Sequence, residues 1–307
     1  MAGELRVGVT APWNFTRLSP ADQRSTLTAV ADAGIDHLFT ADHVSFHGGH
    51  GMDGLMTMAA YSGMEPRLGM HVGVFLLALR HPMVAARQIA TLADIAPGRL
   101  TVGIGVGGED RHEFEVCEVD PGSRGRRTDV GLGLVRRLLD GETVDGDGEF
   151  YDFTAGVIRP SPSPRVPFVV GGRSDAALRR AGTLGDGLLG IWSTAQRFGS
   201  AAARVEEVGD EVGRGDIEWQ HGMQIWVGIG DGPDDGRTNV AETMGRFYNM
   251  PFEPFAKYVP VGNAEQIAET LAPYVDAGAS TLNLTPCGPD PLTAFETIAE
   301  VKRLLLR

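Results

Sequence analysis

The sequence contains little cysteine and no long apolar run, and both shortages restrict what the protein can be. Cys117 and Cys287 are its two cysteines, far apart and not in a metal-type spacing. We expect them to be reduced thiols, with no disulfide framework. The longest apolar run, from Val72 to Leu79, is too short to cross a bilayer and is typical of a buried strand. The first residues, MAGELRVGVTAPW, show no basic region and no long apolar stretch, so we expect no signal peptide and a cytoplasmic protein without membrane contacts.

Positive charge is also scarce, which disfavours some classes of partner. Lys and Arg together number 27 against 40 Asp and Glu, and the net charge is −13. Nucleic-acid binding needs clustered Lys and Arg, so we expect no nucleic-acid partner. An anionic small molecule stays compatible with this charge, because the local field decides its binding. The chain also lacks a G-x-S-x-G motif, which disfavours serine hydrolase chemistry.

Short apolar runs alternate with amphipathic stretches along the whole chain. Eight buried-type strands that alternate with helices indicate parallel pairing through right-handed crossovers, and eight is the number that closes a (β/α)8 TIM barrel. We therefore predict an α/β fold, a single TIM-barrel domain over residues 1–307, with an open doubly wound sheet as the competing architecture. The predicted strands are 5–10, 37–41, 68–76, 99–106, 167–171, 187–191, 223–229 and 280–285. The predicted helices are 20–33, 53–62, 82–95, 124–140, 174–184, 194–212, 235–248, 263–277 and 291–306.

Two segments exceed a minimal barrel and are predicted to be insertions. Residues 141–166 are rich in Gly and Pro around a short alternating apolar piece, which indicates a hairpin. Residues 245–262 are rich in aromatic residues and Pro, which indicates a packed loop or short helices. The aromatic residues there favour local core and, more weakly, the wall of an apolar substrate pocket; they are Phe247, Tyr248, Phe252, Phe255 and Tyr258.

The stretch FVVGGRSDAALRRAG, residues 168–182, is the strongest local signal. A buried strand runs into Gly171 and Gly172, and Ser174 is a preferred N-cap residue for the helix that follows. The free N–H groups of a first helical turn suit an anion, and Arg173 adds positive charge. The stretch is interpreted either as a phosphate site or as an ordinary turn between a strand and a capped helix.

A second glycine-rich turn, GIGVGGED at 103–110, formally contains G-x-G-x-x-G. A dinucleotide fingerprint should open a helix directly and be followed about 20 residues later by an acid. Here Glu109, Asp110 and His112 follow, and then a further loop, so we disfavour a nicotinamide site. We instead expect the glycines to let the end of the strand pass close to a flat ligand, and His112 to line the same ligand-binding mouth.

Three of the eight histidines lie in TADHVSFHGGHG, residues 40–51. His43 and His47 are four apart, which on a helix would suit zinc, but the neighbouring glycines disfavour a helix and no cysteine or carboxylate cluster completes a ligand set. We therefore expect no metal site, and we expect His47 and His50 to be exposed. His43 follows Asp42 at a strand end, where a histidine can donate a hydrogen bond to a cofactor ring or act as acid–base. Asp42 would either fix the tautomer of His43 or bond backbone N–H groups in the turn.

Several motifs together resemble one family, the luciferase-like monooxygenase superfamily. They are DH at 42–43, residues 74–108, EF followed by RGRRTD at 124–129, VVGGRSDAALRRAGTLGDG at 169–187 and residues 261–286. Their order and approximate spacing match the family over nearly the whole chain.

The resemblance implies a TIM barrel with an insertion that binds FMN or coenzyme F420 (8-hydroxy-5-deazaflavin) at the C-terminal mouth. The phosphate would lie on Gly171, Gly172, Arg173 and Ser174. A third-strand bulge, often with a non-prolyl cis peptide, would back the ring near Val72 and Gly73. Val106, Gly107 and His112 would border it. The Asp42–His43 pair resembles the F420-dependent branch. In the sugar-phosphate dehydrogenases of that branch, a Glu in the fourth-strand loop, near the position of Glu109, acts as proton donor.

Three functions follow from these observations. The favoured one is an oxidoreductase that transfers hydride between coenzyme F420 and a small organic substrate, with His43, Asp42 and Glu109 as catalytic residues. The second is a monooxygenase that uses reduced FMN supplied by a partner flavin reductase and activates oxygen. The third is a non-catalytic auxiliary subunit with the same fold. Family members are commonly dimers, so the resemblance also implies a homodimer.

Overall fold

The computed structural model describes residues 4–248 and 250–307, which form two compact units. Of the described residues, unit 1 comprises 4–39, 189–203, 220–248 and 250–307, and unit 2 comprises 40–188 and 204–219. Asn249, which falls in the second expected insertion, lies outside the described residues, as do residues 1–3 of the expected domain. The expectation of a single domain stays a prediction.

Unit 1 is built on parallel strands. Strand β1 (Arg6–Thr10) pairs with β2 (His37–Thr40) and with β9 (Thr281–Cys287). Strand β7 (Gly222–Ile229) pairs with β9, β6 (Gly187–Ile191) and β8 (Val261–Gly262). Strand β8 was not expected from the sequence, because two residues are too few to show an alternating pattern.

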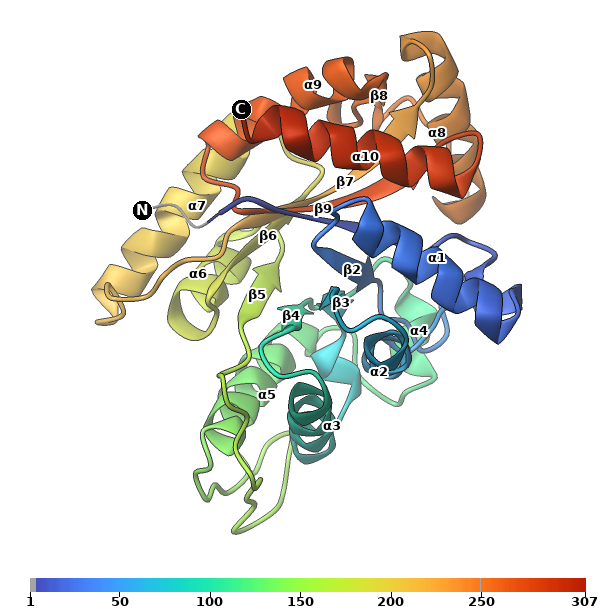
Figure 1. Cartoon of the computed structure of the whole chain (residues 1–307). Coiled ribbons are helices and arrows are strands. Elements are labelled where there is room, and N and C mark those ends of the chain that lie inside the picture. Colours follow the sequence, from blue (N-terminus) through green and yellow to red (C-terminus); the bar gives the residue numbers. More distant parts are fainter. Residues whose placement is uncertain (1–3, 249) are drawn as a thin grey trace. The chain divides into compact units, whose positions relative to one another are not determined.

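The helices of unit 1 follow these strands. They are α1 (Pro20–Asp32), α8 (Pro233–Tyr248), α9 (Ala264–Asp276) and α10 (Pro291–Leu305), with the 3-10 turns η1 (Phe15–Arg17) and η3 (Ala256–Tyr258). Helix α7 (Ala195–Glu211) begins in this unit and ends in unit 2. Helices α9 and α10 pack against each other, and α8 packs on β7 and β8 (Figure 1).

Unit 2 repeats the alternation with three further parallel strands. Strand β4 (Leu100–Ile104) lies between β3 (Gly69–Phe75) and β5 (Phe168–Gly171). Helix α2 packs on β3, α3 packs on α5, and α6 packs on β5. The helices and turns are α2 (Gly54–Met64), η2 (Leu77–Leu79), α3 (Pro82–Ile95), α4 (Arg111–Glu115), α5 (Arg124–Leu139) and α6 (Asp175–Leu184).

The first expected insertion, residues 141–166, contains an antiparallel pairing. Val144 bridges Gly156, the N–H of Gly146 donates to the carbonyl of Phe153, and the N–H of Gly148 donates to the carbonyl of Tyr151. This is the hairpin that its alternating pattern indicates. Within the described helices, none is both long and apolar enough to cross a membrane.

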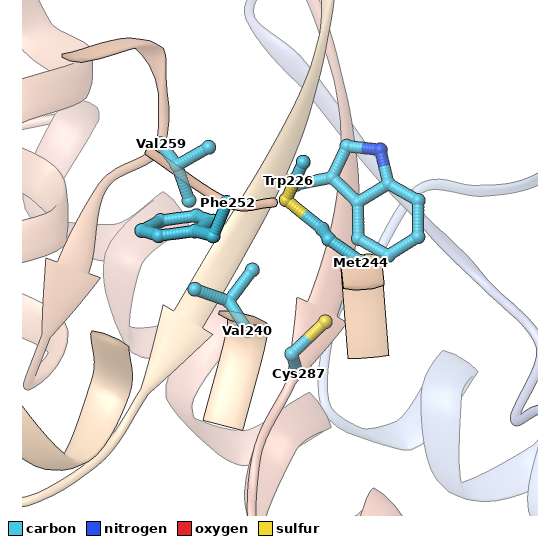
Figure 2. Packing of buried hydrophobic residues seen from close by; sticks show 6 residues of the cluster. All are labelled: Trp226, Val240, Met244, Phe252, Val259 and Cys287. Atoms are coloured by element: carbon cyan, nitrogen blue, oxygen red, sulfur yellow. The ribbon is translucent and has the colours of Figure 1, made fainter. Parts of the chain in front are cut away.

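The second expected insertion contributes to the core of unit 1. Figure 2 shows Phe252 and Val259 packed with Trp226 of β7, Cys287 of β9, and Val240 and Met244 of α8. Phe247, Tyr248 and Phe255 are partly buried against the same cluster. These contacts support the interpretation of the aromatic residues as local core, since burying such rings removes large apolar areas from water.

Candidate active site

The segments that follow strands β3, β4 and β5 meet in unit 2. The peptide bond between Gly73 and Val74 is cis, one residue beyond the position that the resemblance implies, and the β3–β4 register shifts between Val72 and Phe75. A side chain at Gly105 would overlap Val74, and one at Gly171 would lie 3.0 Å from Cγ1 of Val74. Glycine at these two strand ends therefore makes room for the Val74 side chain, which the sequence did not single out.

Asp42 is 1% exposed and connects the end of β2 to the segments after it. Its carboxylate accepts hydrogen bonds from the backbone N–H of Gly54 at 2.8 Å and of Leu76 at 2.9 Å, and from Nη2 of Arg80 at 2.7 Å. Burial raises the pKa of Asp42, while Arg80 and the two N–H groups oppose that shift. Of the two roles considered for Asp42, the structure shows the second, bonding of backbone N–H groups.

His43 takes its carboxylate partner from another segment. Its Nδ1 lies 3.3 Å from Oε2 of Glu113, whose side chain is 3% exposed. The other oxygen of Glu113 accepts from the N–H of Val44 at 2.6 Å and of Ser45 at 3.2 Å. The His43 side chain is 17% exposed, and its Nε2 takes part in no hydrogen bond within the described residues. The arrangement presents Nε2 to a ligand while Nδ1 is engaged.

The rest of the histidine-rich loop is a tight turn. Phe46 and His50 exchange backbone hydrogen bonds of 2.8 and 2.7 Å around His47, which has a φ of +41°. The buried Phe46 ring stacks on His43, with 4.1 Å between ring centroids, and lies 3.9 Å from His47. His47 and His50 are both exposed, as expected. Within the described residues no group of three or more His, Cys, Asp or Glu is arranged to hold a metal ion.

Glu113 is held by α4, a helix that was not expected from the sequence. Asp110 caps it by accepting from the N–H of His112 at 2.9 Å, and the same carboxylate accepts from the N–H of His47 at 2.7 Å. Phe114 is fully buried with Ala78 and Val119 and anchors the helix. Because Phe114 points into the core, its neighbour Glu113 is directed at the loop after β2.

The other residues expected near the β4 turn lie apart from this contact. Glu109 and His112 are exposed, and Val106 and Gly107 are partly exposed. Gly107 has a φ of +63°, and a side chain there would lie 2.9 Å from the Phe114 ring, so glycine is required both by conformation and by packing. Glu113 was missed as a site residue, although the Asp-x-x-Glu spacing at 110–113 is a recognised signal for a helix start.

The turn after β5 has the geometry of an anion site. Ser174 caps α6 by accepting from the N–H of Ala177 at 3.3 Å, and Arg173 and Ser174 are exposed. Gly172 has a φ of +138°, and a side chain there would lie 2.6 Å from Cβ of Ala177. The remaining first-turn N–H groups and Arg173 favour a phosphate, whereas Asp175 in the same turn opposes it.

The chain belongs to the luciferase-like monooxygenase family, because the model of that family matches residues 5–281. An uncharacterized protein of Mycobacterium tuberculosis is 34% identical over 218 residues, which are 69% of this chain and 75% of that protein. An F420-dependent glucose-6-phosphate dehydrogenase of Beutenbergia cavernae is 32% identical over 60% of this chain and 56% of that enzyme.

Solved structures show the same fold. An F420-dependent secondary alcohol dehydrogenase, in complex with an F420–acetone adduct, matches with a TM-score of 0.85 and 18% identity over 99% of both chains. The oxygenating constituent of 3,6-diketocamphane monooxygenase from Pseudomonas putida, in complex with FMN, matches with a TM-score of 0.77 and 18% identity over 98% of both chains. The fold is therefore the predicted (β/α)8 barrel, and the chain is an oxidoreductase of the luciferase-like type.

Proposed function

We propose that the protein is a coenzyme F420-dependent oxidoreductase that acts on a small organic substrate. When bound, a deazaflavin accepts or donates a hydride. The observation that carries the proposal is His43, whose Nε2 is open to a ligand while Nδ1 is engaged by Glu113. The named F420-dependent relative supports this cofactor, as does the F420-dependent structure of the same fold.

The residues of unit 2 fit a phosphate-bearing cofactor. Gly172, Arg173 and Ser174 lead into the first turn of α6, where Arg173 and Ser174 are exposed and backbone N–H groups and a guanidinium favour an anion. The Val74 side chain packs against Gly105 and Gly171, which carry no side chains, and it offers an apolar support for a flat ring. In this proposal His43 gives or takes a proton at Nε2, the buried strand at Val72 and Gly73 backs the ring, and Val106 and Gly107 border it.

Asp42, Glu109 and His112 receive different roles in the proposal. Asp42 holds the turn that presents His43, since its carboxylate is already engaged by Gly54, Leu76 and Arg80. Glu109 and His112 are exposed at the β4 turn and are available to a substrate. We further propose that the protein is cytoplasmic and that it forms a homodimer. Light scattering of the purified protein would test the dimer.

Titration of the purified protein with coenzyme F420 and with FMN, followed by fluorescence quenching, tests the choice of cofactor. We expect tight binding of F420. Arg173→Gln should weaken that binding, and His43→Ala should retain it but lower turnover by about 100-fold, the contribution typical of a positioned acid–base. Unchanged turnover in His43→Ala would remove the role assigned to this side chain.

The alternative is a reduced-FMN monooxygenase, which the FMN-bound structure of the same fold supports. In that case reduced FMN, supplied by a flavin reductase, would bind in preference to F420, and oxygen consumption would depend on it. A third outcome, no turnover by this chain unless a partner subunit is added, would indicate an auxiliary subunit.

A further inference from the structure

We propose that Glu113 is a positioning residue that fixes the proton of His43 on Nδ1 and thereby presents Nε2 as a proton acceptor. The inference rests on the proposed function for its effect on turnover, but the tautomer itself does not depend on any cofactor. Neither the fold nor the family match assigns a role to Glu113.

The hydrogen bonds of Glu113 carry the argument. Oε1 accepts from two backbone N–H groups, those of Val44 and Ser45, and these donors cannot change roles. An ionised carboxylate is an acceptor at both oxygens, so the atom facing Oε2 must donate. That atom is Nδ1 of His43, at 3.3 Å. With the proton on Nδ1, the neutral ring carries its lone pair on Nε2.

The surroundings fix the ring as well as its proton. Phe46 stacks on the His43 ring, with an angle of 25° between the ring planes. A side chain at Gly51 would overlap Cβ of His43, so the returning loop lies directly against the histidine. Phe114, fully buried, holds α4 and prevents Glu113 from moving away. A histidine held on one ring face, at Cβ and at Nδ1 has little freedom except to exchange a proton at Nε2.

The loop contains a similar contact at a more exposed histidine, His47. Asp110 accepts from the N–H of His47 and lies 3.7 Å from its Nδ1, but the His47 side chain is 44% exposed. Asp110→Asn therefore makes the same chemical change as Glu113→Gln, on the same helix, beside a histidine that the proposal does not use. Asn also caps helices well, so α4 should persist.

The test is the tautomer of His43, read from long-range 15N–1H correlations of 15N-histidine-labelled, cofactor-free protein at a pH where the ring is neutral. His43→Gln identifies the His43 signals. We expect the Nδ1–H form in the wild-type protein. In Glu113→Gln the carbonyl oxygen still accepts from Val44 and Ser45, so the amide N–H₂ faces Nδ1 and the proton should move to Nε2. Asp110→Asn should leave the His43 signals unchanged.

Turnover provides the second measurement, with reduced or oxidised F420 as the probe. Glu113→Gln should lower kcat by about 10- to 100-fold, because the wrong nitrogen carries the proton, while the Kd for the cofactor changes by less than about threefold. An Nε2–H form in the wild-type protein would overturn the inference without any variant having to fold. An unchanged tautomer in Glu113→Gln would overturn it too, as would an equal change in Asp110→Asn. A changed tautomer in a protein that never turns over F420 would support the positioning role and remove the proposed function.

Discussion

In unit 2 three buried carboxylates hold segments beside the strands, whereas in unit 1 a group of aromatic rings packs beside β6 and β7. Asp42, Glu113 and Asp186 are each buried, and each accepts at least one backbone N–H; Asp186 accepts from Phe168 at 2.8 Å and also binds Arg136 and Arg165. Hydrogen bonds to a carboxylate are directional, so they fix the orientation of the segments they join.

Unit 1 relies on packed rings around β6 and β7. Trp192, whose φ is +50°, lies 4.7 Å from Phe255 between ring centroids, and Tyr248 stacks on Phe255 at 5.6 Å. Trp13, which is 60% exposed, stacks on Trp226 at 5.9 Å. Ring packing is far less directional than a hydrogen bond and tolerates changes of shape. The unit with His43 therefore uses directional bonds to orient its segments, while the rings of unit 1 form a less directional apolar core.

The largest expected loss of stability comes from replacing a buried carboxylate of unit 2. Asp42→Asn should lower the free energy of unfolding by about 4 kcal/mol, because Arg80 loses its buried charge partner and the new amide group faces a backbone N–H. Urea denaturation followed by circular dichroism measures this loss. A loss below about 1 kcal/mol would show that the carboxylate is not essential to the turn.

The next largest expected effect is the pH dependence of stability that comes from His37, a buried histidine of unit 1. His37 is 2% exposed, its Nε2 lies 2.7 Å from Oδ1 of Asn283, and burial lowers its pKa from 6.5 to about 4. The pKa of His37 is lower in the folded than in the unfolded protein. The contribution of neutral His37 to the free energy of unfolding is therefore complete above pH 6.5 and is lost as the pH falls toward 4. The loss should reach about 3 kcal/mol.

Unfolding curves at pH 7, 6, 5 and 4 measure this dependence, and His37→Gln provides the comparison because glutamine does not titrate. We expect the variant to lose less stability than the wild-type protein between pH 6.5 and 4. Parallel curves for the two proteins would mean that another group controls the acid transition. A shallower loss of stability in the variant would show that the buried His37 must stay neutral for unit 1 to be stable.

Much of the fold follows from the sequence, for a physical reason. Each of the eight predicted strands is a short apolar run bounded by turn residues, and caps such as Ser174 and Asn263 mark the helix starts. The family match and the solved structures confirm the barrel. Strand β8 and helix α4 were missed, because two residues cover a single strand repeat and five residues little more than one helical turn, so neither pattern recurs.

Only part of the candidate site could be predicted from the sequence. His43 and the Gly171–Ser174 turn stand at strand ends, where the chain order alone places them. The partner of His43 could not be found in this way, since Glu113 is 70 residues away and its direction depends on the burial of Phe114. Asp42, adjacent in sequence, was the obvious partner, but its carboxylate is engaged by Gly54, Leu76 and Arg80.

A smaller effect is expected from the rings of unit 1. Phe252→Leu should lower the free energy of unfolding by about 1–2 kcal/mol, since leucine keeps most of the apolar volume but leaves part of the space empty and loses the Arg237 guanidinium 5.0 Å from the ring. Phe255→Leu, at a partly buried ring, should cost less. Chemical denaturation of both variants checks the order. A loss as large as that of Asp42→Asn would contradict the tolerance assigned to this unit.

The smallest effect should come from the exposed partner of the same arginine. Asp53 lies 3.1 Å from Nη2 of Arg80 but its side chain is 36% exposed, and it caps α2 by accepting from the N–H of Met56. Asp53→Asn keeps the cap, since asparagine serves equally well there, and removes only a solvated ion pair, so the loss should stay within about 1 kcal/mol. Comparison of the stability losses of Asp53→Asn and Asp42→Asn separates the effect of losing a charge partner of Arg80 from the effect of burial. Equal losses in the two variants would mean that attraction to Arg80 matters and burial does not, which would remove the distinction drawn for unit 2.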